Sequence, residues 1–292
     1  MYAPAFITYR SNLSNDWRSA VRQDSQIADL EALGFSGTTR DLLKAGQTAL
    51  RDVINRSGEE TDAWREIAPD LIFGPPIPDP DKILCIGLNY RAHAQESGLE
   101  VPPVPVVFAK FRNSLIGPGA PIELPAISQQ VDYEGELAVV IGRRCKHVSP
   151  SEALSVVAGY SALNDVSARD LQLQVSQWTL GKAIDTFAPM GPGLVPAHRI
   201  PDPQKLELIT RLNGRVVQHS STADMIFSVA EIIAYLSRSM TLEPGDIIAT
   251  GTPAGVGFKR DPVLFLKAGD TVEVEISSIG LLSNPVVKPL PA

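Results

Sequence analysis

The sequence of 292 residues predicts a mainly β protein that also contains α-helices, an α+β fold in two unequal parts. Two observations support this class. From residue 82 onward, short runs rich in Val, Ile and Leu end at Gly, Pro or Asn, as strands joined by turns do. In the segment 74–81, four prolines remove N–H donors and fix φ, so neither helix nor sheet continues through it. We therefore expect a small α+β domain at 1–73, a proline-rich linker at 74–81 and a larger β-rich domain at 82–292.

The N-terminal part is expected to contain a hairpin and a helix. Residues 17–21 and 26–30 can pair around a polar turn at 22–25. A helix is expected after Thr38 and Thr39, because apolar residues then recur at helical spacing. Its buried face would carry Leu42, Leu43, Leu50, Val53 and Ile54.

The C-terminal part begins with an apolar run, 82–90, that indicates a buried strand, and continues into a helical turn at 91–98 that ends at a glycine. A longer helix is expected to begin at Ser228, where Glu231 completes a capping box. The pattern suits a mixed β-sandwich or β-roll. Further strands are expected at 106–110, 137–142, 206–212, 215–218, 247–250 and 271–277.

Composition and charge argue against several classes of function. The formal net charge is −7 and no basic stripe is present, so no nucleic-acid partner is expected, since Lys and Arg must neutralise phosphates. No apolar segment is long enough to span a bilayer, so no membrane partner is expected. The two cysteines, Cys85 and Cys145, offer neither a disulfide framework nor a thiolate metal cluster. We expect a cytoplasmic enzyme, with an organellar location left open.

The most informative stretch is 131–141, where Glu134 and Glu136 lie two residues apart at the start of an apolar run. In a strand both would project from the same face and could share one divalent cation. The same spacing recurs at Glu273 and Glu275, where alternation with valine indicates a solvated face instead. Spacing alone therefore leaves both interpretations open.

Two further groups could join this pair. Asp165 follows another apolar run and could supply a third carboxylate, or it could cap a helix that starts near Val166. His93 and Glu96 lie three residues apart on the expected helical turn, so Glu96 could orient the imidazole and raise its basicity for taking a proton from water. Alternatively, they form an exposed pair without a task, or they are metal ligands themselves.

Several motifs, in order along the chain, resemble those of the fumarylacetoacetate hydrolase family. They cover roughly 82–287 and are independent of one another, which argues against coincidence. One departure is Ser167, where many members carry threonine. The motifs are Gly87-Leu88-Asn89-Tyr90 with His93 and Glu96, Asp132-Tyr133-Glu134-Gly135-Glu136-Leu137, Asn164-Asp165-Val166-Ser167-Ala168-Arg169-Asp170, Gly181-Lys182, Asp185-Thr186-Phe187, and the run from Thr250 to Gly257.

The resemblance implies the mixed β-sandwich-roll catalytic domain of this family at 82–292, and a homodimer. It implies a divalent metal, Mg²⁺ or Mn²⁺, held by Glu134, Glu136 and Asp165. It also implies that His93 and Glu96 act as a catalytic dyad.

The same resemblance implies a substrate class and the remaining site residues. A small-molecule 2-oxo acid would bind the metal through its carboxylate and keto oxygens. Lys182 would place positive charge near the developing anion, although it could instead form a structural ion pair with a neighbouring aspartate. Arg169, Gln172 and Thr252 are expected to bind the substrate.

These implied roles predict hydrolysis of a C–C bond in a 2,4-dioxo acid of the acylpyruvate or fumarylpyruvate type, with His93 activating the water and a metal-stabilised enolate as the product. The same enolate arises in the alternative reactions. These are decarboxylation of a 2-oxo acid such as oxaloacetate, and isomerisation or hydration of an unsaturated 2-oxo acid. A catalytically silent binding module is an alternative of a different class.

Overall fold

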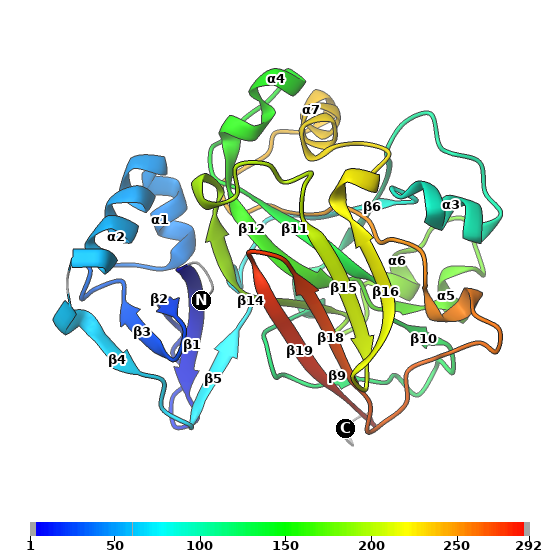
Figure 1. Ribbon diagram of the computed structural model, residues 1–292, viewed down its shortest axis with the longest axis horizontal. Coiled ribbons are helices and arrows are strands. Elements are labelled where there is room, and N and C mark those ends of the chain that lie inside the picture. The colour runs from blue at the N-terminus through cyan, green and yellow to red at the C-terminus, as the bar shows by residue number, and fades with distance from the viewer. Residues whose placement is uncertain (1–3, 60, 289–292) are drawn as a thin grey trace.

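Two packed β-sheets form the framework of residues 4–59 and 61–288, which are the residues that this computed structural model describes (Figure 1). The predicted domains also include residues 1–3, 60 and 289–292, which lie outside the described residues. The larger sheet has twelve strands. Ten follow the order β4-β3-β2-β1-β14-β12-β11-β17-β6-β7, while β5 pairs with β1 and β8 pairs with β14. Their bounds are β1 Ala5–Ser11, β2 Arg18–Gln23, β3 Gln26–Asp29, β4 Trp64–Glu66, β5 Leu71–Gly74, β6 Ile83–Gly87, β7 Val106–Lys110, β8 Leu115–Ile116, β11 Gly135–Ile141, β12 Val157–Asn164, β14 Ala188–Pro196 and β17 Ile247–Ala249.

The second sheet has five strands in the order β16-β15-β18-β19-β9. Its apolar face packs against β11 and β12, because Val274 and Ile276 belong to the same buried cluster as Leu137 and Val139. The two packed sheets, with few helices around them, confirm the predicted α+β sandwich. The bounds are β9 Ile122–Glu123, β15 Glu207–Leu212, β16 Arg215–Ser221, β18 Thr271–Ile276 and β19 Gly280–Val287, and a separate antiparallel pair joins β10 (Val131–Asp132) to β13 (Ser167–Ala168).

The helices are short and lie at the margins of the sheets (Figure 1). Helix α7 begins at the predicted capping box, in which Ser228 accepts from the N–H of Glu231 and Glu231 accepts from the N–H of Ser228. No helix among the described residues has the length and apolar character needed to cross a membrane. The bounds are α1 Thr39–Ala45, α2 Gln47–Glu59, α3 Arg91–Ser97, α4 Pro150–Ala153, α5 Arg169–Gln172, α6 Thr179–Lys182 and α7 Val229–Ser239, with 3₁₀ turns η1 Thr61–Ala63, η2 Arg112–Ser114, η3 Leu154–Val156, η4 Ala197–Arg199, η5 Thr222–Asp224 and η6 Gly257–Lys259.

The single helix predicted after Thr38 is two helices, α1 and α2. Gly46 separates them with φ of 99°, a conformation that glycine adopts without the strain of a Cβ. The predicted apolar face is nevertheless buried, with Leu42 and Leu43 on α1 and the other three apolar residues on α2. The prediction of one continuous helix was wrong because it followed apolar spacing and gave no weight to the glycine.

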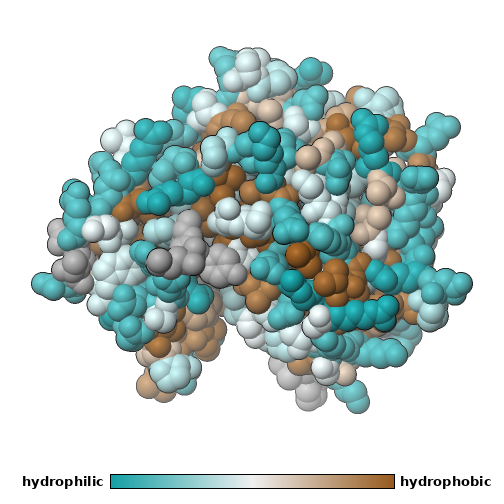
Figure 2. Space-filling view, viewed as in Figure 1, coloured by the Kyte–Doolittle hydropathy of each residue, from teal (hydrophilic) through white to brown (hydrophobic). Residues whose placement is uncertain are grey.

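The N-terminal part shares its sheet and its core with the rest of the chain. Strand β1 is antiparallel to β14, with Phe6 opposite Leu194, and both residues belong to one buried cluster together with Leu42 of α1. The proline-rich segment is also packed, because Pro76 is buried and its carbonyl accepts a hydrogen bond from the hydroxyl of Thr8. Figure 2 shows hydrophobic side chains exposed along the seam between the two parts. The division at 74–81 therefore stays a prediction about domains, whereas the sheet is continuous.

Candidate active site

Three carboxylates predicted to bind metal meet at one end of the β11–β12 pair. In this antiparallel pair Gly135 lies opposite Asn164, so the residues that flank them, Glu134 and Asp165, are brought together. The N–H of Asp165 donates to the carbonyl of Glu134 at 2.8 Å. Together with Glu136 they offer ligand oxygens that all lie within 4.8 Å of one another, and all three side chains are buried.

The two glutamates do not both lie in one strand, although the sequence predicted that they would. Glu136 lies in β11, but Glu134 precedes the strand, and its N–H donates to the side-chain oxygen of Asn164 at 3.0 Å. The comparison pair Glu273 and Glu275 lies in β18, where it alternates with buried residues, as predicted for a solvated face. Asp165 caps no helix, because it is followed by strand β13.

Three buried cations surround these carboxylates. The ammonium of Lys182 lies 2.8 Å from Glu134 and 2.7 Å from Asp165, so its pairing is with the site and not with a neighbouring aspartate of its own segment. Arg169 contacts Glu134 at 2.7 Å. Lys110 contacts Asp165, and sequence reasoning missed it. The available indication was a lone charged residue that ends the otherwise apolar strand β7.

Burial and charge shift the pKa values of the carboxylates in opposite directions. Burial acts to raise the pKa of Glu134, but the charges of Lys182 and Arg169 prevail and lower it to about 2. The pKa of Glu136 is raised well above its ordinary value, because burial is reinforced by the charges of Asp165 and Glu134. Burial would lower the pKa of Lys182, yet Asp165 and Glu134 outweigh it and raise that pKa.

The donor set fits a divalent metal. Glu136 forms no ion pair with any part of the chain that the structure describes, and one of its oxygens accepts from the N–H of Gly251 at 2.7 Å. A buried carboxylate without a cation is costly, and a hard cation among three carboxylate oxygens would relieve that cost. The site can therefore hold a divalent metal at the predicted residues.

The donor to Glu136 depends on a tight backbone approach. Gly251 has φ of 101°, and a Cβ at this position would come within 2.7 Å of the Cβ of Asn89. Asn89 in turn donates to the carbonyl of Thr250 at 2.7 Å and accepts from the N–H of Phe227 at 2.8 Å. The Asn89 side chain thus fixes the turn that points an N–H at Glu136, a role that its position in a quoted motif did not reveal.

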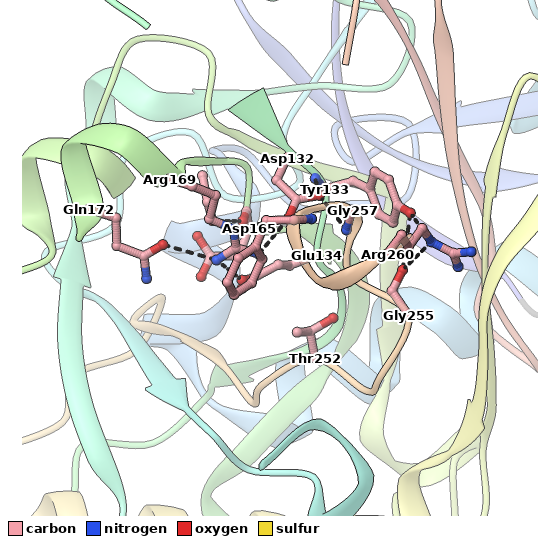
Figure 3. Close-up of polar contacts among 12 residues, drawn as sticks. Asp132, Tyr133, Glu134, Asp165, Arg169, Gln172, Thr252, Gly255, Gly257 and Arg260 are labelled. Carbon is pink, nitrogen blue, oxygen red and sulfur yellow. Dashed lines mark hydrogen bonds and ion pairs between the residues drawn. The ribbon is translucent and has the colours of Figure 1, made fainter. Parts of the chain in front are cut away.

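Seven of the nine predicted site residues line one cavity of about 280 Å³. Figure 3 shows Glu134, Asp165 and Arg169 converging, with Gln172 beyond Arg169 and Thr252 facing them from another loop. Asp165 and Glu96 are not among the lining residues, but each contacts one of them, Lys182 and His93 respectively. Those that line the cavity are His93, Glu134, Glu136, Arg169, Gln172, Lys182 and Thr252.

The predicted dyad is formed on helix α3. The Nδ1 atom of His93 lies 3.3 Å from the carboxylate of Glu96, and the imidazole is buried against the cavity. The helix ends as predicted at Gly98, which has the left-handed conformation. Glu96 also accepts from the N–H of Gly255 at 3.0 and 3.1 Å, so it is fixed between α3 and the following loop. This arrangement leaves Nε2 of His93 to exchange a proton with a bound molecule.

The three residues predicted to bind substrate also hold one another and the protein. Arg169 donates to Gln172 at 2.9 Å and to Asp132 at 2.9 Å. The hydroxyl of Thr252 donates to the carbonyl of Gly135 at 3.0 Å. Their roles toward a substrate stay predictions, but each lies where a molecule in the cavity would touch it.

A buried carboxylate anchors the loop that covers the site. Asp132 accepts from the N–H groups of Gly257 and Phe258 at 2.8 and 3.1 Å, in addition to Arg169. On the other side of this loop, Arg260 donates to Tyr133 at 3.0 Å (Figure 3). Asp132 of β10 and the adjacent Tyr133 therefore hold the two ends of the turn η6 at the cavity.

A buried three-carboxylate centre with adjacent lysine and imidazole, set in a mixed β fold, defines an enzyme with a candidate divalent-metal site. The model of the fumarylacetoacetate hydrolase C-terminal family matches residues 82–287. The chain belongs to this family.

Curated and solved relatives agree with the family. The chain is 44% identical over 271 residues to the mitochondrial oxaloacetate tautomerase fahd2 of Xenopus laevis, covering 91% of this chain and 84% of that protein. It is 34% identical to the fumarylacetoacetate hydrolase of Exiguobacterium antarcticum, with a TM-score of 0.83 over 98% of this chain and all of that one. It is also 34% identical to a 5-carboxymethyl-2-hydroxymuconate delta-isomerase of Mycobacterium smegmatis, with a TM-score of 0.77 and the same coverage.

The predicted cytoplasmic location is contradicted by these relatives. The Xenopus protein is named mitochondrial, and so are its rat and human counterparts. The prediction, which left an organelle open, was wrong because it rested on finding no apolar signal region and no membrane-spanning run in the sequence. Neither absence excludes an organelle, because location depends on targeting segments that an import machinery reads separately from the fold.

Proposed function

We propose that this protein is a metal-dependent tautomerase that interconverts the keto and enol forms of oxaloacetate. The observation that carries the proposal is the group of three buried carboxylates within 4.8 Å of one another at the base of a cavity. The name of the Xenopus relative supports oxaloacetate as the substrate. The isomerase relative supports a reaction in which a proton moves and the carbon skeleton is kept.

Glu134, Glu136 and Asp165 would hold the metal, and we propose Mg²⁺ or Mn²⁺ because all three donors are carboxylate oxygens. When bound, such a cation polarises the 2-oxo group of the substrate and makes the neighbouring C3–H more acidic. Lys182 adds positive charge close to this point, since its ammonium lies between Glu134 and Asp165.

His93 is the group best placed to move the proton. Its Nδ1 is held by Glu96, so Nε2 would take the proton from C3 while the C–H electron pair becomes the C2–C3 double bond. A proton returned to the 2-oxo oxygen completes the enol, and the reverse sequence restores the ketone. No water and no leaving group are required.

The relatives, weighed by identity, favour this reaction over the hydrolysis predicted from sequence. The Xenopus relative, at 44% identity, is named a tautomerase, whereas the relatives at 34% identity are named a hydrolase and an isomerase. The relative of higher identity therefore favours keto–enol exchange over cleavage of an acylpyruvate. The same residues serve both chemistries up to the loss of a proton, so the dyad alone does not identify hydrolysis. The predicted alternatives, decarboxylation of an oxaloacetate-like acid and isomerisation or hydration of an unsaturated 2-oxo acid, come closer than hydrolysis. The proposed reaction shares its substrate with the first and its proton transfer with the second.

The test follows the enol of oxaloacetate by its ultraviolet absorbance, with carbon dioxide release and pyruvate formation measured in parallel. We expect Mg²⁺ or Mn²⁺ to support rapid enol–keto exchange, and a chelator to abolish it. Glu273→Gln, which alters a glutamate of β18 at the same spacing and outside the cavity, serves as the matched control for Glu136→Gln. Rapid release of carbon dioxide or cleavage of a 2,4-dioxo acid, with no faster exchange than in buffer, would contradict the proposal.

We further propose that the protein is a homodimer, as the resemblance to the family implied. Sedimentation at micromolar concentration tests this, and a monomer would contradict it.

A further inference from the structure

The cationic side chains that line the active cavity differ in how many ion pairs they form with carboxylates of the protein. Arg169 and Lys182 each contact two carboxylates of the protein, so their charge is already paired within the protein. Lys259 lines the same cavity, and among residues 4–59 and 61–288 no carboxylate forms an ion pair with it. Within the described part of the chain its ammonium donates one hydrogen bond, to the carbonyl of Ser97 at a long 3.4 Å.

Lys259 is held at the cavity by its neighbours rather than by its own charge. It ends the turn η6, whose Gly257 and Phe258 donate their N–H groups to buried Asp132. The ring of Phe258 lies 4.2 Å from the Cζ of Arg169 and 5.0 Å from the ammonium of Lys259. Because both distances are measured to the same ring, the Cζ of Arg169 and the ammonium of Lys259 can be no farther apart than their sum. Arg169 marks the metal end of the cavity, and Lys259 marks its exposed mouth.

The remaining wall offers an anion little else. Between the metal centre and the mouth the cavity is lined by apolar side chains, among them Leu88, Leu99, Phe108 and Trp178. Gln172, Thr252 and Ser97 also line the cavity and can offer a hydrogen bond, but none of them carries a positive charge. A carboxylate that is desolvated there without a cation remains unfavourable. A substrate tail that reaches Lys259 recovers an ion pair.

We infer that Lys259 binds the distal carboxylate of the substrate and makes this site selective for dicarboxylates over monocarboxylates. The inference rests on the proposed function and deepens it. The first carboxylate and the 2-oxo group occupy the metal end, and the second carboxylate lies toward the mouth. Because Lys259 is exposed, the selectivity is modest, about fivefold in affinity, as for a partly solvated ion pair.

The experiment compares malate with lactate, because the two probes differ only in the distal carboxylate and neither is turned over by keto–enol exchange. Calorimetry in the presence of Mg²⁺ gives their affinities for the wild type, Lys259→Met, Lys259→Arg and Lys267→Met. Methionine keeps the packing against Phe258 and removes the charge, arginine keeps the charge, and Lys267 is an exposed lysine farther along the same segment.

We expect Lys259→Met to weaken malate binding about fivefold and to leave lactate binding unchanged, with Lys259→Arg and Lys267→Met close to wild type. Unchanged malate binding in Lys259→Met, or an equal loss for both probes, would overturn the inference. Exchange of oxaloacetate is measured on the same wild-type sample. If the wild type catalyses exchange but malate binds Lys259→Met as tightly as wild type, the inference alone is refuted. If Lys259→Met weakens malate binding but the wild type does not catalyse exchange, the proposed function alone is refuted.

Discussion

Two clusters of ion-paired side chains, one in the active site and one in the N-terminal part, contain similar residues but differ in their exposure to water. At the active site, the side chains of Lys110 and Asp165 are both 0% exposed. In the N-terminal cluster, Asp29 is 15% exposed and binds Arg18 and Arg65, which are 51% and 42% exposed. Both clusters match opposite charges within hydrogen-bonding distance. The difference between them lies in how much water remains.

Water decides what each cluster can do. Around Asp29 solvent screens the charges, so adding or removing one partner changes the free energy of unfolding by about 0–1 kcal/mol. In the active site burial leaves little water to screen them, and each charge acts strongly on its neighbours. The pKa of Glu136 rises and that of Glu134 falls to about 2, although the two residues are almost adjacent in sequence. Dense buried charge is thus costly for folding but useful for binding a cation and stabilising an anion.

The largest effect is expected from removing a ligand carboxylate. Glu136→Gln should lower the rate of enol–keto exchange by about a thousandfold, because polarisation by a metal is worth several kcal/mol in the transition state. Calorimetry should show weaker Mg²⁺ binding, while circular dichroism shows an intact fold. If the variant keeps wild-type activity, the proposed metal centre is contradicted.

The next effect tests the proton-transfer residue. His93→Ala should slow exchange by about a hundredfold or more, as for the loss of a general base. Its affinity for Mg²⁺ and for oxalate should stay near wild type, because the imidazole acts on a proton and not on the cation. A loss of metal binding would show instead that His93 is a ligand.

A smaller effect is expected from replacing Lys110, the buried lysine that sequence reasoning missed. Lys110→Met should reduce Mg²⁺ affinity or activity by about 10- to 100-fold, since Asp165 then loses the partner that orients it. We expect Lys110→Arg to recover little, because a larger guanidinium does not fit a fully buried position. Equal metal affinity in Lys110→Met and wild type would exclude an orienting role.

A substitution in the N-terminal cluster around Asp29 tests the same comparison from the solvated side. Arg65→Met removes a partner of Asp29 that lies far from the cavity in sequence and structure, so activity should be unchanged. The free energy of unfolding should change by less than about 1 kcal/mol, as for other solvated pairs. Urea unfolding of this variant beside Lys110→Met compares the two clusters directly. Similar effects in both variants would contradict the distinction drawn from burial.

The smallest effect concerns the capping box of α1. The N–H and hydroxyl of Thr38 donate to Asp41 and lower its pKa, so the folded state favours the charged carboxylate. This contribution is present above the ordinary aspartate pKa of about 3.9 and is lost as the pH falls through the lowered value. Asp41→Asn should therefore destabilise the protein by about 0.5 kcal/mol at pH 7 and by less near pH 3. Asp52→Asn on α2 is the control, and a larger cost in acid would reverse the sign of this argument.

Local patterns predicted much of the fold but little of the site's charge balance. Strand β7, the hairpin of β2 and β3 and the cap of α7 each follow from neighbouring residues. The carboxylate centre was accessible through the resemblance of several motifs to one family. Lys110 was not, because its partner Asp165 lies 55 residues away and meets it only after the sheet has formed. The anchoring role of Asp132 was hidden for the same reason, since it depends on N–H groups of a distant loop.

The pairing of β1 with β14 has a consequence for any shortened form of the protein. If residues before 75 were removed, one edge of β14 would lose its neighbour, and the apolar side chains that pack against Phe6 and Leu42 would meet water. An unpaired strand edge beside a bare apolar surface invites strands from other molecules to add to it. We therefore expect the chain from 75 onward to aggregate, even though it keeps every residue of the proposed site.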